Sequence, residues 1–186
     1  MGRGAAMALM IGILAGPGQA APVTGRVAAA ALLSPKGAQA VMIPTRALSD
    51  KDAQILRQAA ATQKYYGAVA ISPDQGLMSD ATLAAANYHD VASARTAALA
   101  GCDKRRKPGS AACVIVAVIL PIGWKEGAAV QLSADATAAF GQLKGRRVMA
   151  VDTATGDWGA GTAPQAALAA CQAKTGTKSC EIVISD

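Results

Sequence analysis

The stretch AALAGC at residues 97–102 recurs as AALAAC at residues 166–171, and this repetition decides how the chain is organised. Each copy ends in a cysteine and is followed by one more cysteine. A β-branched run then follows each second cysteine, VIVAV at 114–118 and IVI at 182–184. Because all four cysteines of the chain fall at matching places, the pattern predicts a tandem duplication.

Both copies are predicted to contain the order helix, strand, strand, helix, strand. In the first copy these are a helix capped by Ser49, a strand at 66–71, a turn at 72–76, a strand near Leu77 and Met78, a helix from Asp90 to Cys102 and a strand at 113–119. In the second copy they are a helix capped by Ser133, strands at 148–151 and from Trp158, a helix opened by Thr162 and Pro164, and a strand at 180–185. Helices laid against an antiparallel-rich sheet indicate an α+β fold.

The predicted boundaries divide the chain into five parts. These are a leader at 1–20, an N-terminal lead-in at 21–47 with an edge strand near 40–43, a first repeat at 48–120, a linker at 121–131 and a second repeat at 132–186. Each repeat supplies three strands and a thin alanine-rich core. We therefore expect one pseudo-symmetric, disulfide-stapled domain, and the alternative is two loosely tethered domains.

The first twenty residues have the pattern of a secretory signal. Arg3 supplies the positive start, an uncharged apolar run follows at 5–15, and Gly16 and Pro17 break it before small residues. We expect cleavage after Ala20 and a periplasmic or secreted protein. The alternative is a membrane anchor, but a spanning helix needs about 20 apolar residues.

The four cysteines allow three pairings, and the repeat favours Cys102 with Cys113 and Cys171 with Cys180. Each bridge would stabilise its copy by roughly 2–3 kcal/mol in the loop-entropy model. A zinc site is the alternative, but the gaps are long and the single histidine, His89, is near neither pair. No Cys-x-x-Cys motif indicates redox catalysis, so we expect no metal and no cofactor.

The loops between paired cysteines carry the best candidate for binding. The chain is basic, with a formal net charge of +6. The possible anion-binding residues are Lys104, Arg105, Arg106 and Lys107 in the first loop and Lys174 and Lys178 in the second. Cations on a pinned loop suit an unknown macromolecule or an anionic envelope component. Nucleic acid is disfavoured because the loops lack stacking aromatics. The alternative is a solvated loop without a ligand.

Catalytic signatures are weak. His89 is followed by Asp90, but Asp90 is already explained as a helix cap and no nucleophile motif accompanies the pair. The glycine-rich segment around Trp158 lacks the Gly-Lys-Ser/Thr ending of a phosphate loop. We therefore assign no catalytic residue and expect an exported, noncatalytic binding or interaction protein. The alternative is a small periplasmic enzyme or enzyme inhibitor with a site near His89 and Trp158.

The pattern resembles a family of small secreted bacterial domains of unknown function. In the first copy the shared elements are YGAVA at 66–70, Gly76, the alanine-rich helix at 94–102 and the strand at 113–116. In the second copy they are the segments 148–151, 156–159, 166–171 and 180–183. The first copy lacks the Trp-Gly pair after its turn glycine, and the second lacks the Tyr-Gly that opens the strand. The resemblance implies export and disulfides, and it implies no activity.

Overall fold

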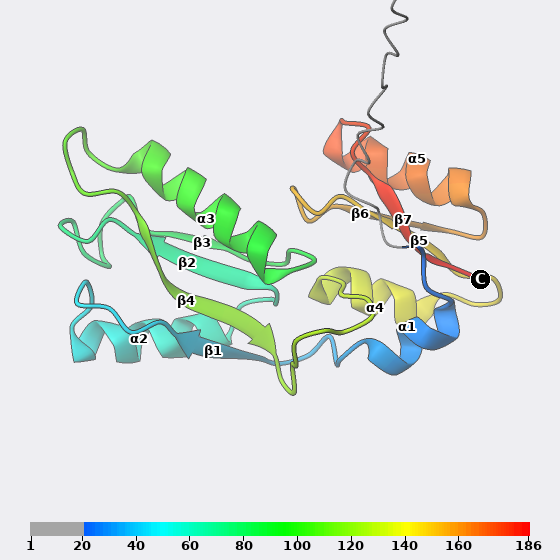
Figure 1. Ribbon diagram of the computed structural model, residues 1–186, viewed down its shortest axis with the longest axis horizontal. Coiled ribbons are helices and arrows are strands. Elements are labelled where there is room, and N and C mark those ends of the chain that lie inside the picture. The colour runs from blue at the N-terminus through cyan, green and yellow to red at the C-terminus, as the bar shows by residue number, and fades with distance from the viewer. Residues whose placement is uncertain (1–20) are drawn as a thin grey trace, which may run out of the picture.

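The protein forms two α/β units that lie side by side (Figure 1). The computed structural model describes residues 21–186, and the leader predicted at 1–20 lies outside the described residues. The two units have separate sheets, of four and three strands. This mixed arrangement of helices and antiparallel strands confirms the predicted α+β class.

The first unit contains a four-stranded antiparallel sheet in the order β1-β4-β2-β3. Its elements are β1 (Ala38–Met42), α2 (Asp50–Ala61), β2 (Gly67–Ile71), β3 (Leu83–Ala85), α3 (Val91–Arg105) and β4 (Val114–Pro121). The helix α2 packs Leu56 and Ala60 against one face of the sheet. The helix α3 packs Ala94 and Ala98 against the other face, so the unit has three layers.

The second unit contains a three-stranded antiparallel sheet in the order β6-β5-β7. Its elements are α1 (Gly25–Ala31), α4 (Ala134–Gln142), β5 (Val148–Val151), β6 (Trp158–Gly161), α5 (Pro164–Thr175) and β7 (Glu181–Ser185). Val23 pairs with Ile184 of β7, so the first described residues belong to the second unit. The chain then crosses to the first unit and returns.

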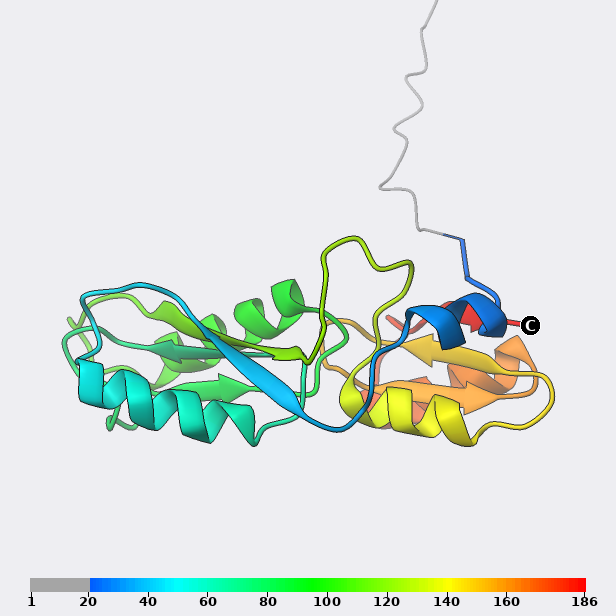
Figure 2. The ribbon, with the colours of Figure 1, turned by 90° about the horizontal axis from the view of Figure 1, so that it is seen from below.

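The two units share more than their order of elements. In each, the first strand of the helix-strand-strand-helix-strand run is flanked by the other two. The register of the central strand shifts at Val69/Ala70 in β2 and at Met149/Ala150 in β5. The helices α3 and α5 lie on the same side of the molecule, and α1, α2 and α4 lie on the opposite side (Figures 1 and 2). These shared features are compatible with the predicted duplication.

Two local predictions are wrong. The second strand of the first copy is not near Leu77 and Met78, because the chain turns there and the strand begins at Leu83. The Thr82 hydroxyl donates to the carbonyl of Leu77 at 2.6 Å and holds this turn. The helix α5 is not capped by Thr162, because its N-cap residue is Ala163, which has no side-chain cap bond. Pro164 is the first residue of that helix, as its fixed φ favours.

None of the helices described over residues 21–186 is long and apolar enough to cross a membrane.

Candidate functional site

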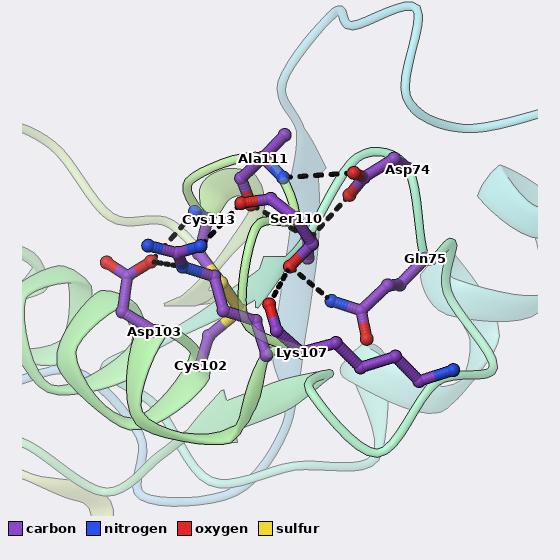
Figure 3. A network of polar contacts seen from close by, with 10 residues as sticks. Asp74, Gln75, Cys102, Asp103, Lys107, Ser110, Ala111 and Cys113 are labelled. Carbon is purple, nitrogen blue, oxygen red and sulfur yellow. Dashed lines mark hydrogen bonds and ion pairs between the residues drawn. A yellow bond between two sulfur atoms is a disulfide. The ribbon is translucent and has the colours of Figure 1, made fainter.

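The first disulfide loop is fastened by the residues around it (Figure 3). The Cys102–Cys113 bond ties the last turn of α3 to the start of β4, with 6.1 Å between the Cα atoms. One Asp103 carboxylate oxygen accepts bonds from the Cys113 amide at 3.0 Å and from Arg106 Nε at 2.9 Å. The bond from Cys113 and the ion pair with Arg106 lower the pKa of Asp103. Arg106 also donates to the carbonyl of Ser110, so this cation has a structural role.

The turn after β2 fastens the same loop from its other side (Figure 3). Asp74 accepts a hydrogen bond from the Ala111 amide at 3.0 Å, and Gln75 donates to the Ser110 hydroxyl at 2.8 Å. The buried Ser72 hydroxyl lies 2.9 Å from the carbonyl oxygen of Ala111. The loop is therefore held between a disulfide and a turn.

Of the four predicted cations in this loop, three are exposed and form no ion pair among the described residues. They are Lys104, Arg105 and Lys107. They extend from the end of α3 on a backbone that is already fixed. The set of predicted anion-binding residues is therefore reduced by one, because the Arg106 guanidinium is bonded to Asp103 and Ser110 within the loop.

The second disulfide loop is fastened by one buried carboxylate. Asp152, only 2% exposed, follows β5 and contacts the loop that the Cys171–Cys180 bond closes. It accepts hydrogen bonds from the hydroxyls of Thr175, at 2.8 Å, and Ser179, and from the Ala154 amide at 2.9 Å. Burial acts to raise the pKa of Asp152, but these hydrogen bonds outweigh it and lower the pKa.

The two predicted cations of the second loop differ in their surroundings. Lys174 Nζ lies 3.7 Å from the centre of the Trp158 ring, which is a cation–π geometry. Lys178 is exposed in the loop between the paired cysteines. Trp158 is therefore half-covered by a lysine and packs within the second unit.

Charge is unevenly divided between the two helical layers. The helices α3 and α5 carry four basic residues and one acidic residue, whereas α1, α2 and α4 carry three of each. The disulfide loops add Arg106, Lys107 and Lys178 beside α3 and α5, and the loops next to α1, α2 and α4 also carry cations, among them Lys36, Arg46, Lys144 and Arg146. The two loops do not merge into one cluster. The first turn of α3 lies beside the second unit, and its 15 residues carry the first loop about 20 Å away.

His89 lies at the junction between the two units and is only 2% exposed. Its Nδ1 accepts a hydrogen bond from the Ser133 amide at 3.0 Å, so its Nε2 carries the proton and donates to the Asp157 carbonyl, also at 3.0 Å. Burial lowers the pKa of His89 and keeps the ring neutral. Neither ring nitrogen is left to act as a base or to bind a metal.

The other junction contacts gather at the first turn of α4. Asn87 accepts from the Asp135 amide and donates to the Asp135 carboxylate, both at 3.1 Å. Lys64 forms an ion pair with the same carboxylate at 2.6 Å. The Ala134 amide donates to the carbonyl of Tyr65 at 3.2 Å. The sequence does not predict these contacts, because no local pattern links positions so far apart in the chain.

A cavity of about 310 Å³ lies at this junction, and His89 and Asp90 are part of its wall. Trp158 does not line this cavity, although His89 contacts the preceding residue, Asp157. Within residues 21–186 no three His, Cys, Asp or Glu side chains lie close enough together to hold a metal ion.

Comparison of the chain with models of protein families, with curated proteins and with solved structures finds no match.

Proposed function

We propose that this protein is exported and binds, without catalysis, phosphate groups of an anionic envelope component through its α3/α5 layer. The observation that carries this proposal is the excess of basic over acidic residues in the helices α3 and α5 themselves, four against one. A layer with excess positive charge attracts anions over a distance set by the salt concentration. The helices α1, α2 and α4 themselves have no such excess.

The fixed backbone of the disulfide loops supports the same function. Lys104, Arg105 and Lys107 extend from a segment held by a disulfide and by the turn after β2. Because that backbone is already ordered, binding costs only the ordering of the side chains. An extended anionic surface also suits two basic loops that lie at separate places on one side of the molecule.

The alternative, an enzyme or inhibitor with a site near His89 and Trp158, has less support. His89 has both ring nitrogens bonded to the main chain. Trp158 is packed beneath Lys174. Export is supported by the two disulfides, which form and persist in oxidising compartments.

The proposal is tested by sedimentation of the oxidised protein with vesicles that contain phosphatidylglycerol in phosphatidylcholine. A variant with Lys104→Gln, Arg105→Gln and Lys107→Gln removes the three exposed cations of the first loop. Each cation near an anionic surface contributes about 1 kcal/mol, so we expect binding to weaken by roughly a hundredfold at low salt.

The matched control carries Lys51→Gln, Arg57→Gln and Lys144→Gln, three exposed cations outside the α3/α5 layer. It has the same net charge as the first variant and should bind nearly as well as the unaltered protein. Equal loss in the two variants would show that only net charge matters and would contradict the proposal. Absence of binding by the unaltered protein would also contradict it.

A further inference from the structure

The start of α4 donates three consecutive backbone amides to the first unit. These amides belong to residues 133–135. Their acceptors are atoms of the first unit, namely His89 Nδ1, the Tyr65 carbonyl and the Asn87 side-chain oxygen, at 3.0, 3.2 and 3.1 Å. The first amides of a helix have no acceptor within the helix. The hydrogen bonds of these three amides therefore depend on contact between the two units.

His89 is the titratable acceptor among the three. It is the single histidine of the chain, and both of its ring nitrogens are bonded to the main chain of the second unit. A protonated ring has a hydrogen on each nitrogen and cannot accept a bond from the Ser133 amide. It also places a positive charge at the N-terminus of α4, where the helix dipole is positive. Protonation of His89 therefore removes one bond across the junction and adds a repulsion there.

Other charged groups near His89 come from each element around it. They are the carboxylates of Asp90, Asp152, Asp157 and Asp135, the last of which is paired with Lys64. Cleavage after Ala20, which we expect for an exported protein, adds the α-amino group of Ala21 to the wall of the cavity that His89 lines. The linker residues in that wall, 128–131, are uncharged. Burial outweighs the attraction of the carboxylates, so the pKa of His89 is lowered.

Most contacts that hold each unit together lie within that unit. The two sheets are separate, and each disulfide closes within one unit. In the part of the chain that the structure describes, Ala134 is the single residue of the second unit in the buried cluster beneath α3. A cavity of about 310 Å³ also interrupts the packing between the units. Regions with few buried apolar contacts open at a lower free energy than cores, so opening is expected at the junction first.

From these contacts we propose that His89 makes the junction between the two units open in mild acid. At neutral pH the unprotonated ring accepts the Ser133 amide and holds the start of α4 against the first unit. In mild acid the protonated ring releases α4, and the junction opens while both sheets stay folded. Opening exposes the cavity whose wall includes His89 and Asp90. This response is separate from anion binding at the α3/α5 layer and does not depend on it.

Amide hydrogen exchange followed by NMR tests the proposal in the oxidised protein between pH 7 and pH 5. The reporters are the amides of residues 133–135, and the references are amides of the central strands β2 and β5. We expect protection factors at least tenfold lower for the reporters than for the references, because the junction opens without unfolding of the sheets. Below pH 6.5 the reporters should lose protection by up to about tenfold per pH unit, until the pKa of the buried ring is passed. Equal slopes for the three reporters would show that the start of α4 is released as one piece.

The variant His89→Asn offers an amide oxygen near the position of Nδ1 and does not titrate, and it keeps every other charged group at the junction. Its reporter protection factors should be constant from pH 7 to pH 5. The matched control Lys64→Gln removes the exposed ion pair with Asp135 and keeps His89. It should lower the reporter protection factors by about two- to fivefold at every pH and leave their slope unchanged.

Three results would each overturn the proposal. They are equal protection of reporters and references, reporters without pH dependence in the unaltered protein, and an unchanged slope in His89→Asn. The first two are measured on the unaltered protein, so they remain decisive even where His89→Asn does not fold.

Discussion

The two units use the same disulfide position but fasten their disulfide loops differently. In the first unit the loop is held by several weak contacts, from Ser72, Asp74 and Gln75 on one side and Asp103 on the other. In the second unit Asp152 alone receives most of the bonds. A distributed set of contacts tolerates the loss of one member. A single buried charge does not, so the two units should respond unequally to matched substitutions.

The helices also approach the sheets differently. In the second unit Gly159 of β6 lies against the backbone of α5, where a Cβ atom would overlap Ala167 O and Cys171 N. In the first unit the close approach is made by Gly101 of α3, where a Cβ atom would overlap only the end of the Leu83 side chain. Backbone atoms of a helix cannot move aside, whereas a leucine methyl group can.

The largest expected effect comes from this difference. Gly159→Ala should lower the free energy of unfolding by at least ~3 kcal/mol, because α5 must shift away from β6. Gly101→Ala should change it by less than about 1 kcal/mol, since the strain on Leu83 is offset by the better helix propensity of alanine. Urea unfolding followed by circular dichroism measures both. Similar losses in the two variants would show that the packing of the two helices is equivalent.

The next effect concerns the buried carboxylate. Asp152→Ala should lower the free energy of unfolding by about 2–3 kcal/mol, because the Thr175 and Ser179 hydroxyls and the Ala154 amide lose a charged acceptor. Asp74→Ala, its counterpart in the first unit, should have a clearly smaller effect. The same unfolding experiment compares them, and a greater loss for Asp74→Ala would reverse the comparison between the loops.

Acid should act on the contact between the units. The pKa of His89 is lowered in the folded protein, so its contribution to stability is fully present above the unfolded pKa near 6.5 and is lost as pH falls below that value. The slope reaches about 1.4 kcal/mol per pH unit until the folded pKa is passed. Measured between pH 7.5 and 5, stability should fall in the unaltered protein. In His89→Asn it should fall less steeply, and parallel curves would exclude His89 as the cause.

The smallest effect concerns the cation above Trp158. Lys174→Gln removes the cation–π contact and should lower the free energy of unfolding by about 0.5–1 kcal/mol. The emission of Trp158 should change in the Trp124→Phe background, because the charge near its ring is lost. Unchanged emission and stability would show that the contact is not maintained in solution.

Local chemistry made part of the fold predictable. Ser49, Asp90 and Ser133 were expected to cap helices, and each accepts the capping hydrogen bond in the structure. These signals work because a cap acts within three residues of itself. The cysteine pairing could also be inferred, because repeated spacing fixes which loops close.

Features that depend on distant contacts could not be predicted. The sequence offers His89 as a candidate catalytic residue, and only the approach of Ser133 and Asp157 shows its structural role. The sequence predicts a strand too early, because the apolar residues Leu77 and Met78 resemble strand residues. In the structure both lie in a turn, in which Leu77 is buried and Met78 is 85% exposed. The sequence does not indicate that Tyr66 and Trp124 line the same cavity, because the walls of that cavity come from segments far apart in the chain.

The pairing of Val23 with Ile184 also sets an order for folding. The second unit takes its edge contact and α1 from residues 21–31, but the rest of it comes from residues that follow the entire first unit. The first unit can form its sheet from a continuous stretch of chain, whereas the second must close a loop of more than 150 residues to receive α1. Loop closure on that scale is slow in proteins rich in non-local contacts. We therefore expect the first unit to fold early and serve as the surface on which the second unit assembles.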